Sequence, residues 1–171
     1  MQNLNAEAST RTPAQSGVLI RAGLDRNDHH QVVLGGMVID FKVTSRDNPG
    51  GLFVMEGTQT KRGGPPRHVH YEQDEYFYIL EGRYMFEVGG DRFEVGPGDS
   101  LFGPRRLPHT FMFTGEGRGR MLIAYQPAGK MEAFFTALAA RPGIPEPEEL
   151  KDLFARHGME ITGAPLALSL I

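Results

Sequence analysis

The sequence predicts an all-β protein, a small antiparallel barrel covered by two helices near its C-terminal end. Glycine and proline are abundant, at 22 and 12 of 171 residues, which implies many turns and therefore many short strands. Apolar and polar residues alternate from Val32 to about Val95, which is typical of strands with one buried face. A helical repeat of apolar residues begins only after Gly129. A chain of this length is the size of one domain.

The strands are expected at short intervals, separated by turn residues. The first five segments read VVLGGMVIDFKVT, GLFVMEG, RHVH, EYFYILEG and RYMFEVGGDRFEVGPGD. The last of them contains the clearest hairpin, YMFEV and RFEV around a Gly-Gly-Asp turn, because this turn supplies the positive φ angles that a tight hairpin requires. Further strands are expected at Ser100 to Phe102, at His109 to Phe113 and at MLIAY. This pattern is that of an antiparallel meander.

Two helices are expected after the strands. In the first, four apolar residues recur at helical spacing before a Pro-Gly stop: Met131, Phe134, Phe135 and Leu138. The second lies in PEPEELKDLFARHG, where acidic residues occupy the first turn, basic residues the last, and Gly158 the C-terminal cap position. We expect both helices to cover the open side of the sheet.

The chain is therefore expected to divide into three parts. Residues 1–16 are polar and aperiodic and are expected to form a flexible N-terminal arm. Residues 17–127 are expected to form the β-barrel. Residues 128–171 are expected to form a C-terminal helical segment that packs on the barrel.

The composition argues against several classes of function. No cysteine is present, so a tight metal site must use histidine and carboxylate ligands. The formal net charge is -3 and the basic residues are scattered, which argues against nucleic-acid binding. The N-terminus lacks the apolar core of a secretory signal, and no apolar run approaches the length of a membrane span. A cytoplasmic protein is expected.

Histidines in the predicted strands form a candidate metal site with one glutamate. Residues two apart on a strand point to the same face, so His68 and His70 turn their imidazoles into one interior. Glu75 shares a strand face with Phe77 and Ile79. Because an unpaired carboxylate on an apolar face costs several kcal/mol, a divalent cation beside the two imidazoles is its expected partner.

His109 completes this predicted ligand set from a distant strand. Asp74 and Glu72 are the rival carboxylates, but Asp74 points away from the buried face of its strand, and this favours Glu75. The alternative is a rigid polar core without a metal. His29 and His30 lie in a polar stretch and are expected in a solvated turn.

The text around these ligands, HVHYEQDEYFYILEG followed by GPGDSLFGPRRLPHTFMF, resembles the two sequence motifs of the cupin superfamily. The positions that match the first motif are His68, His70, Glu75 and Gly82, and those that match the second are Gly98, Pro104 and His109. The chain departs from the motifs at Arg62, Arg106 and Phe113. Because none of these is a predicted ligand, the departures concern loop conformation and pocket shape.

The resemblance covers roughly Val32 to Tyr125, while the C-terminal part is similar to single-domain cupins described as quercetinase-like. It implies a jelly-roll barrel, also called a double-stranded β-helix, with one divalent metal ion on the four ligands. Three imidazoles and one carboxylate leave open positions on the ion, which suits Fe, Mn, Ni, Co or Cu, while Zn is less expected.

The resemblance to quercetin 2,3-dioxygenases implies an enzyme that brings a small-molecule substrate and dioxygen together at the metal. The substrate would be a flavonol or another enolisable compound, and Glu75 would be both a ligand and the base that accepts its hydroxyl proton. The alternatives are a metal-containing binding protein without turnover and an isomerase that uses the ion as a Lewis acid. A homodimer is expected, since isologous dimers are the commonest assemblies.

Other side chains are weaker candidates for contact with the substrate. Six strand residues could line a pocket, although core packing explains each of them as well: Phe77, Ile79, Phe86, Phe111, Phe113 and Tyr125. Arg105 and Arg106 could meet an anionic substrate at the barrel mouth, although such loop arginines are usually solvated. Tyr76 and Tyr78 are expected on the opposite face of their strand.

Overall fold

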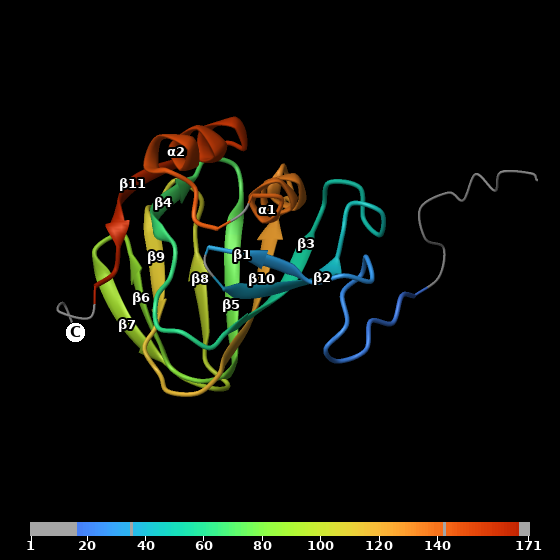
Figure 1. Cartoon of the computed structure of the whole chain (residues 1–171), viewed down its shortest axis with the longest axis horizontal. Helices are drawn as coiled ribbons and strands as arrows, with labels where there is room; N and C mark the ends of the chain where they lie inside the picture. Colours follow the sequence, from blue (N-terminus) through green and yellow to red (C-terminus); the bar gives the residue numbers. More distant parts are fainter. Residues whose placement is uncertain (1–16, 35, 142, 168–171) are drawn as a thin grey trace, which may run out of the picture.

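Two antiparallel sheets face each other across the core of the protein (Figure 1). The structure is a computed structural model and describes residues 17–34, 36–141 and 143–167. The strands of the first sheet, in spatial order, are β1 (Gln31–Val33), β2 (Met37–Val43), β3 (Phe53–Gln59), β10 (Gly119–Gln126), β5 (Asp74–Glu81) and β8 (Ser100–Gly103). Those of the second are β11 (Met159–Pro165), β4 (Pro66–His70), β9 (His109–Phe113), β6 (Tyr84–Val88) and β7 (Asp91–Val95).

The predicted all-β jelly roll with two helices is confirmed, with one difference in its closure. Within the described ranges, no ladder of hydrogen bonds joins the two sheets into a closed barrel. The sheets instead pack face to face, as in a sandwich. The predicted arm, residues 1–16, lies outside the described residues.

The alternation of side chains along β5 shows how the sequence fills the core. Glu75, Phe77 and Ile79 are buried, while Tyr76 and Tyr78 on the other face are 43% and 37% exposed. This two-residue period is the one that the sequence predicts for a strand with one face in the core. The inward-facing side chains of both sheets form a core rich in aromatic rings.

The hairpin predicted at YMFEV and RFEV is confirmed as β6 and β7. The two strands pair from Tyr84 and Val95 at the open end to Val88 and Asp91 at the turn. Gly89 has a φ of 69°, the left-handed conformation that glycine adopts without a steric cost.

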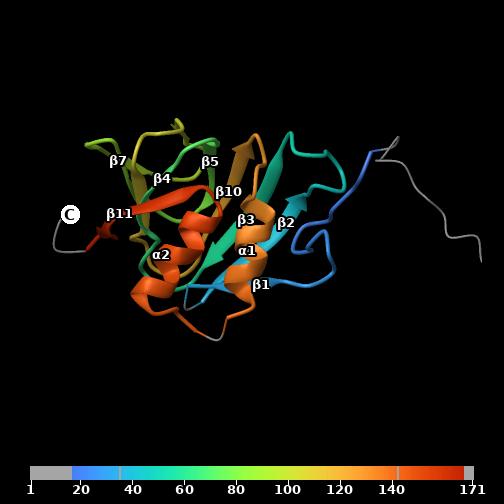
Figure 2. The ribbon, with the colours of Figure 1, turned by 90° about the horizontal axis from the view of Figure 1, so that it is seen from above.

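Helices α1 (Met131–Ala139) and α2 (Pro147–Arg156) lie over one end of the two sheets (Figure 2). The predicted apolar stripe of α1 is buried as expected. Proline begins α2, where no amide hydrogen is needed, and Gly158 after it has a φ of 80°, as the sequence predicts for the end of a helix.

The C-terminal segment, in which the sequence predicts two helices, also contains the strand β11. After α2 the chain returns to the second sheet, where Met159 pairs with His70 and Ile161 with His68. The alternation in MEITG is short and contains a glycine, so the sequence carries little sign of this strand.

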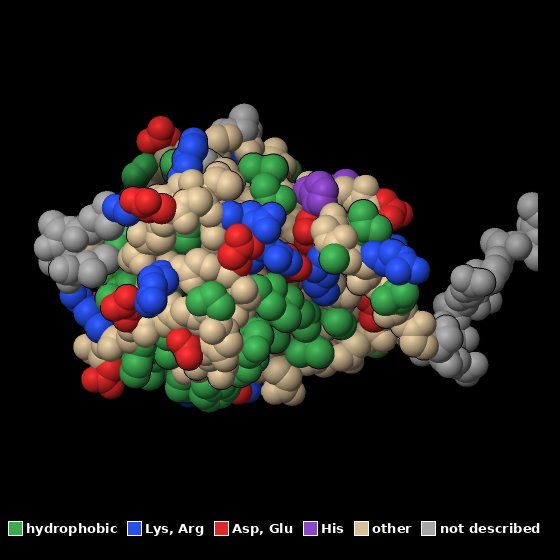
Figure 3. All heavy atoms as spheres, turned by 90° about the horizontal axis from the view of Figure 1, so that it is seen from below, with side chains coloured by type: hydrophobic (Ala, Val, Ile, Leu, Met, Phe, Trp, Pro, Cys, Tyr) green, Lys and Arg blue, Asp and Glu red, His purple; other side chains and the backbone are tan. Residues whose placement is uncertain are grey.

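The surface carries charges of both signs. On the face opposite the helices, Lys and Arg side chains lie next to Asp and Glu among apolar and uncharged groups (Figure 3). No helix in the described part of the chain is long and apolar enough to cross a membrane.

The link before β4 has no room for a side chain at Gly64. A Cβ atom at this position would lie 1.8 Å from the carbonyl oxygen of Phe111, in the backbone of β9. Because a paired strand cannot easily move aside, Gly64→Ala is expected to lower the free energy of unfolding by about 1–3 kcal/mol. Urea denaturation measures this, with Gly96→Ala as the control because nothing lies within 4 Å of that position. Equal stability of the two variants would contradict the account.

Candidate metal centre

The four residues predicted as ligands meet at one point between the two sheets. His68 and His70 come from β4, His109 from β9 and Glu75 from β5 of the opposite sheet. One potential ligand atom from each residue lies within 4.8 Å of the others, and all four side chains are buried. His68 and His109 are direct partners across β4 and β9, so strand register sets their approach. The cluster therefore ties the two sheets together.

Hydrogen bonds to the backbone orient two of the imidazoles. His68 Nδ1 donates to the carbonyl oxygen of Pro66 at 2.8 Å, and His109 Nδ1 donates to that of Leu107 at 3.1 Å. Each bond leaves Nε2 as the nitrogen available to the cluster. Histidines that bind metals are commonly held in this way by their second nitrogen.

His70 is the residue that most needs a further partner. It is 1% exposed, and neither of its ring nitrogens has a hydrogen bond with the residues that the structure describes. Its Nε2 lies 3.3 Å from Glu75 Oε2. Because a buried nitrogen without a partner is costly, a cation between His70 and Glu75 fits this site well. The donor set of three imidazoles and one carboxylate suits a divalent transition metal.

The charges in the cluster are coupled. Burial alone would raise the pKa of Glu75, but contacts with the imidazoles of His109 and His70 outweigh it and hold that pKa well below its usual range. Burial alone would lower the pKa of His109, but its 2.8 Å hydrogen bond to Glu75 raises it. Burial, together with repulsion from the other two histidines, lowers the pKa of His68 to about 3. Without a metal, the contact between the two residues favours a charged His109 beside a charged Glu75.

Tyr125 stands beside this carboxylate on the neighbouring strand. It is the direct partner of Glu75 across β10 and β5, and its ring lies 5.6 Å from that of His70. Burial and the charge and hydrogen bond of Glu75 raise the pKa of Tyr125 well above its usual value. The Tyr125 hydroxyl therefore stays protonated and can donate to Glu75.

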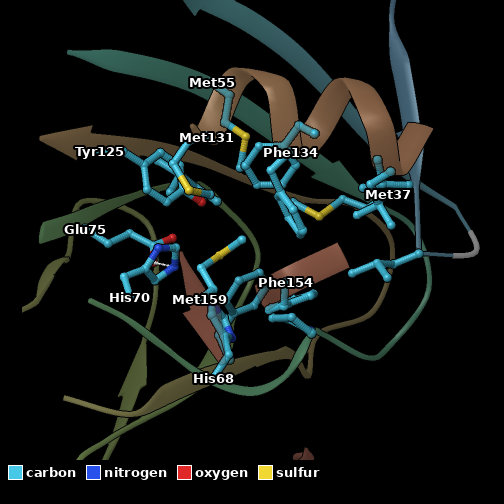
Figure 4. A pocket seen from close by; sticks show the side chains of 17 residues that line it. Met37, Met55, His68, His70, Glu75, Tyr125, Met131, Phe134, Phe154 and Met159 are labelled. Atoms are coloured by element: carbon cyan, nitrogen blue, oxygen red, sulfur yellow. Dashed lines mark ion pairs between the residues drawn. The ribbon is translucent and has the colours of Figure 1, made fainter. Parts of the chain in front are cut away.

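An apolar chamber leads away from the cluster (Figure 4). Its volume is about 40 Å³, room for a few water molecules. Apart from the ligands and Tyr125, its walls are entirely apolar, and their largest members are Met37, Met55, Phe111, Met131, Phe134, Phe135, Phe154 and Met159. The two helices and β11 contribute five of these eight residues, so the C-terminal part of the chain completes the chamber.

The structure divides the six pocket residues that the sequence predicts. Phe111 and Tyr125 line the chamber. The other four, Phe77, Ile79, Phe86 and Phe113, are buried in the core and do not line it. The four methionines of the wall, Met37, Met55, Met131 and Met159, are not among the pocket residues predicted from the sequence. Met131 belonged to a recognised helical stripe, and this was the only signal that the α1 face approached the site.

The rival carboxylate of Asp74 and the two loop arginines make contacts outside the cluster. Asp74 accepts hydrogen bonds from the backbone and side chain of Arg105, with Oδ2 2.7 Å from Nη2. These bonds lower the pKa of Asp74 to about 2. Arg106 contacts backbone carbonyls of His70 and Tyr71. Neither arginine lines the chamber, in contrast to the proposed role at its mouth.

Comparison with known proteins places these ligands in a family. The cupin domain family matches residues 53–125, which span β3 to β10 and include all four predicted ligands. Residues 53–125 are a cupin domain. The geometry agrees, because this domain carries the buried His-His-Glu-His group that could bind one metal ion.

Individual relatives of this cupin are distant. A quercetin 2,3-dioxygenase of Bacillus subtilis is 26% identical over 97 residues, which cover 56% of this chain and 28% of that protein. The chain spans about a third of the length of the curated relatives it matches.

Two solved structures have similar folds. A cupin from Shewanella frigidimarina described as RmlC-like has a TM-score of 0.51 and 19% identity, over 61% of this chain and 87% of that one. The polyketide cyclase RemF from Streptomyces resistomycificus has a TM-score of 0.51 and 26% identity, over 64% of this chain and 80% of that one.

The depressed pKa of His68 makes the stability of the metal-free protein depend on pH. The ordinary pKa of histidine is 6.5, and that of His68 in the folded protein is about 3. Between these pH values His68 is therefore protonated in the unfolded chain and neutral in the folded protein. The free energy of unfolding is therefore expected to fall as the pH decreases from about 6.5 towards about 3, with a contribution from His68 of up to about 1.4 kcal/mol per pH unit. His109, whose pKa is raised, acts in the opposite direction.

Urea denaturation in EDTA at a series of pH values measures this dependence. A His68→Asn variant is expected to lose stability less steeply over the same interval, because it lacks the titrating group. If the free energy of unfolding falls equally steeply with decreasing pH in the variant and in the unchanged protein, His68 does not titrate as described.

Proposed function

We propose that this cupin is a divalent-metal-dependent dioxygenase that acts on an apolar, enolisable small molecule. The observation that carries the proposal is a buried cluster of three imidazoles and one carboxylate at the end of an apolar chamber. A bound metal would supply Lewis-acid activation of the substrate hydroxyl and a meeting point for dioxygen. Fe, Mn, Ni, Co or Cu suits this donor set better than Zn.

Glu75 is the base in this proposal. Its carboxylate is buried within the cluster, where it accepts the proton of the substrate hydroxyl as the enolate forms. Tyr125 and His109 each contact this carboxylate and hold its orientation. The apolar walls exclude water, so the enolate and dioxygen would react without competition from solvent.

The lining of the chamber favours a substrate whose reacting part is uncharged. Among the described residues, no lysine, arginine, amide or aliphatic hydroxyl side chain lines it. A sugar phosphate or a dicarboxylate would lose its hydration here without gaining partners, which costs far more than the burial of an apolar ring. The present volume is too small for such a ring, but methionine side chains have three rotatable bonds and adapt readily to a ligand.

The comparisons support a substrate of this type and also a second reaction class. One relative is a quercetin 2,3-dioxygenase, and one similar structure is a polyketide cyclase. Flavonols and polyketides both contain enolisable carbonyl groups. The similarity to a cyclase favours, as the alternative, a metal-dependent isomerase or binding protein that polarises such a carbonyl without consuming dioxygen.

Oxygen uptake on addition of quercetin to metal-loaded protein tests the proposal. Glu75→Gln is expected to lower the rate at least about 100-fold, because it removes the proposed base. Glu72→Gln, at an exposed carboxylate in the preceding turn, is the matched control and should keep the full rate. A Glu75→Gln variant that retains metal and full oxygen consumption would rule out the role of the base.

A stabilising thermal shift with quercetin, without oxygen uptake or product, would instead support the binding protein. Conversion of a ligand to an isomer without oxygen uptake would support the isomerase. Either result would replace the dioxygenase proposal.

We also propose that the protein forms a homodimer through the outer face of β5 and β8. Tyr76, Tyr78 and Phe102 are 43%, 37% and 57% exposed on this face, and Tyr76 is the direct partner of Phe102. Within the described residues β8 is an edge strand, and exposed aromatic residues at a sheet edge favour association. Sedimentation equilibrium would test this, with Phe102→Glu expected to shift the protein towards the monomer.

A further inference from the structure

A second cavity, of about 200 Å³, adjoins the apolar chamber beside the cluster. The two spaces share three lining residues, Leu34, Met37 and Pro65. Met37 lies at the end of the chamber away from Glu75 and His70 (Figure 4). Three side chains therefore form the wall between the chamber and the second cavity.

The second cavity has a different chemical lining. Residues 60–65 connect β3 of one sheet to β4 of the other (Figure 1), and Lys61 and Arg62 of this link line the cavity. Lys61 has no ion-pair partner within the described ranges of the chain. The carboxylate paired with Arg62 belongs to Glu116, whose side chain is 95% exposed and lies 3.9 Å away. Arg62 Nε also donates to the carbonyl oxygen of Gly115 at 3.4 Å. Because so exposed and distant an ion pair is weak, Lys61 and the Nη atoms of Arg62 are available to an anionic group.

Gln59 supplies an independent sign of a ligand in this cavity. It is the last inward-facing residue of β3 and is 7% exposed. Its Nε2 donates to the carbonyl oxygen of Gly63 at 3.2 Å, but its Oε1 has no hydrogen-bond partner among the residues that the structure describes. A buried acceptor without a donor is costly, and this residue lines the second cavity. A hydroxyl group on a ligand would satisfy it.

We propose that the second cavity is the entrance to the metal chamber and binds the polar end of an amphipathic hydroxycarboxylic acid. Lys61 and Arg62 bind the carboxylate, and Gln59 accepts a hydrogen bond from the neighbouring hydroxyl. The apolar part of the molecule passes Met37 into the chamber. This inference rests on the proposed function, because the part of the molecule inside the chamber would carry the enolisable group that reacts beside Glu75.

The binding of simple probes to metal-free protein tests this subsite separately from the reaction. Calorimetric titration of the full chain in EDTA compares octanol, octanoate and 2-hydroxyoctanoate. We expect affinity to rise in that order, with octanoate about tenfold tighter than octanol. Butanoate is expected to bind more weakly than octanoate, by up to about fourfold for each missing methylene group that the chamber would bury.

Charge reversal locates the binding site of the probes. Lys61→Glu with Arg62→Glu is expected to weaken both acids at least tenfold and octanol less than twofold. The matched control reverses Lys151 and Arg83, which are exposed and line neither cavity, and it should change no affinity. The Gln59→Leu variant is expected to bind 2-hydroxyoctanoate and octanoate with similar affinity, because it lacks the acceptor for the hydroxyl group.

Three outcomes would overturn the inference. They are an absence of binding, equal binding of octanol and the acids, and equal effects of the two charge reversals. Because the metal has been removed, failure of the proposed dioxygenase would appear only in oxygen uptake and would leave these affinities unchanged.

Discussion

The burial of one carboxylate among three imidazoles is the constraint on which the rest of the structure depends. Glu75 is 3% exposed and lies on the core face of the first sheet, while the three histidines belong to the second. A buried carboxylate without a compensating charge costs several kcal/mol. In the metal-free protein the hydrogen bond between His109 and Glu75 favours the charged forms of both groups. A divalent cation would supply it and would also satisfy the nitrogens of His70, which otherwise have no hydrogen bond in the described structure.

The placement of the cluster follows from strand geometry. His68 and His70 face one interior because they are two residues apart on β4, and His109 reaches them because its strand pairs with β4 at His68. The register of β10 against β5 then sets Tyr125 beside Glu75. Backbone pairing thus determines the positions of the groups that the proposed chemistry requires, and the loops contribute little.

The helices and β11 determine what can approach this cluster. Met131 and Phe134 of α1, Phe154 of α2 and Met159 of β11 all line the chamber. The segments that carry these residues lie over one end of the two sheets (Figure 2).

The strands, the hairpin and the residues of the His-His-Glu-His cluster could be predicted because each leaves a local pattern in the sequence. Phe77 and Ile79 alternate with outward-facing tyrosines, and the two histidines of β4 keep the same two-residue spacing. The methionines of the chamber could not be predicted, because a methionine on an inward face looks the same whether it fills the core or lines a cavity. Strand β11 could not be predicted, because its conformation depends on its long-range pairing with β4.

The most direct test of the central claim is the metal content of protein purified without an affinity tag, measured by mass spectrometry beside a His68→Ala, His70→Ala double variant. The account predicts about one Fe, Mn, Ni, Co or Cu ion per chain in the unchanged protein and its loss in the variant. Little metal in both proteins, with equal stability, would contradict it, because the cluster would then be a polar core that needs no cation.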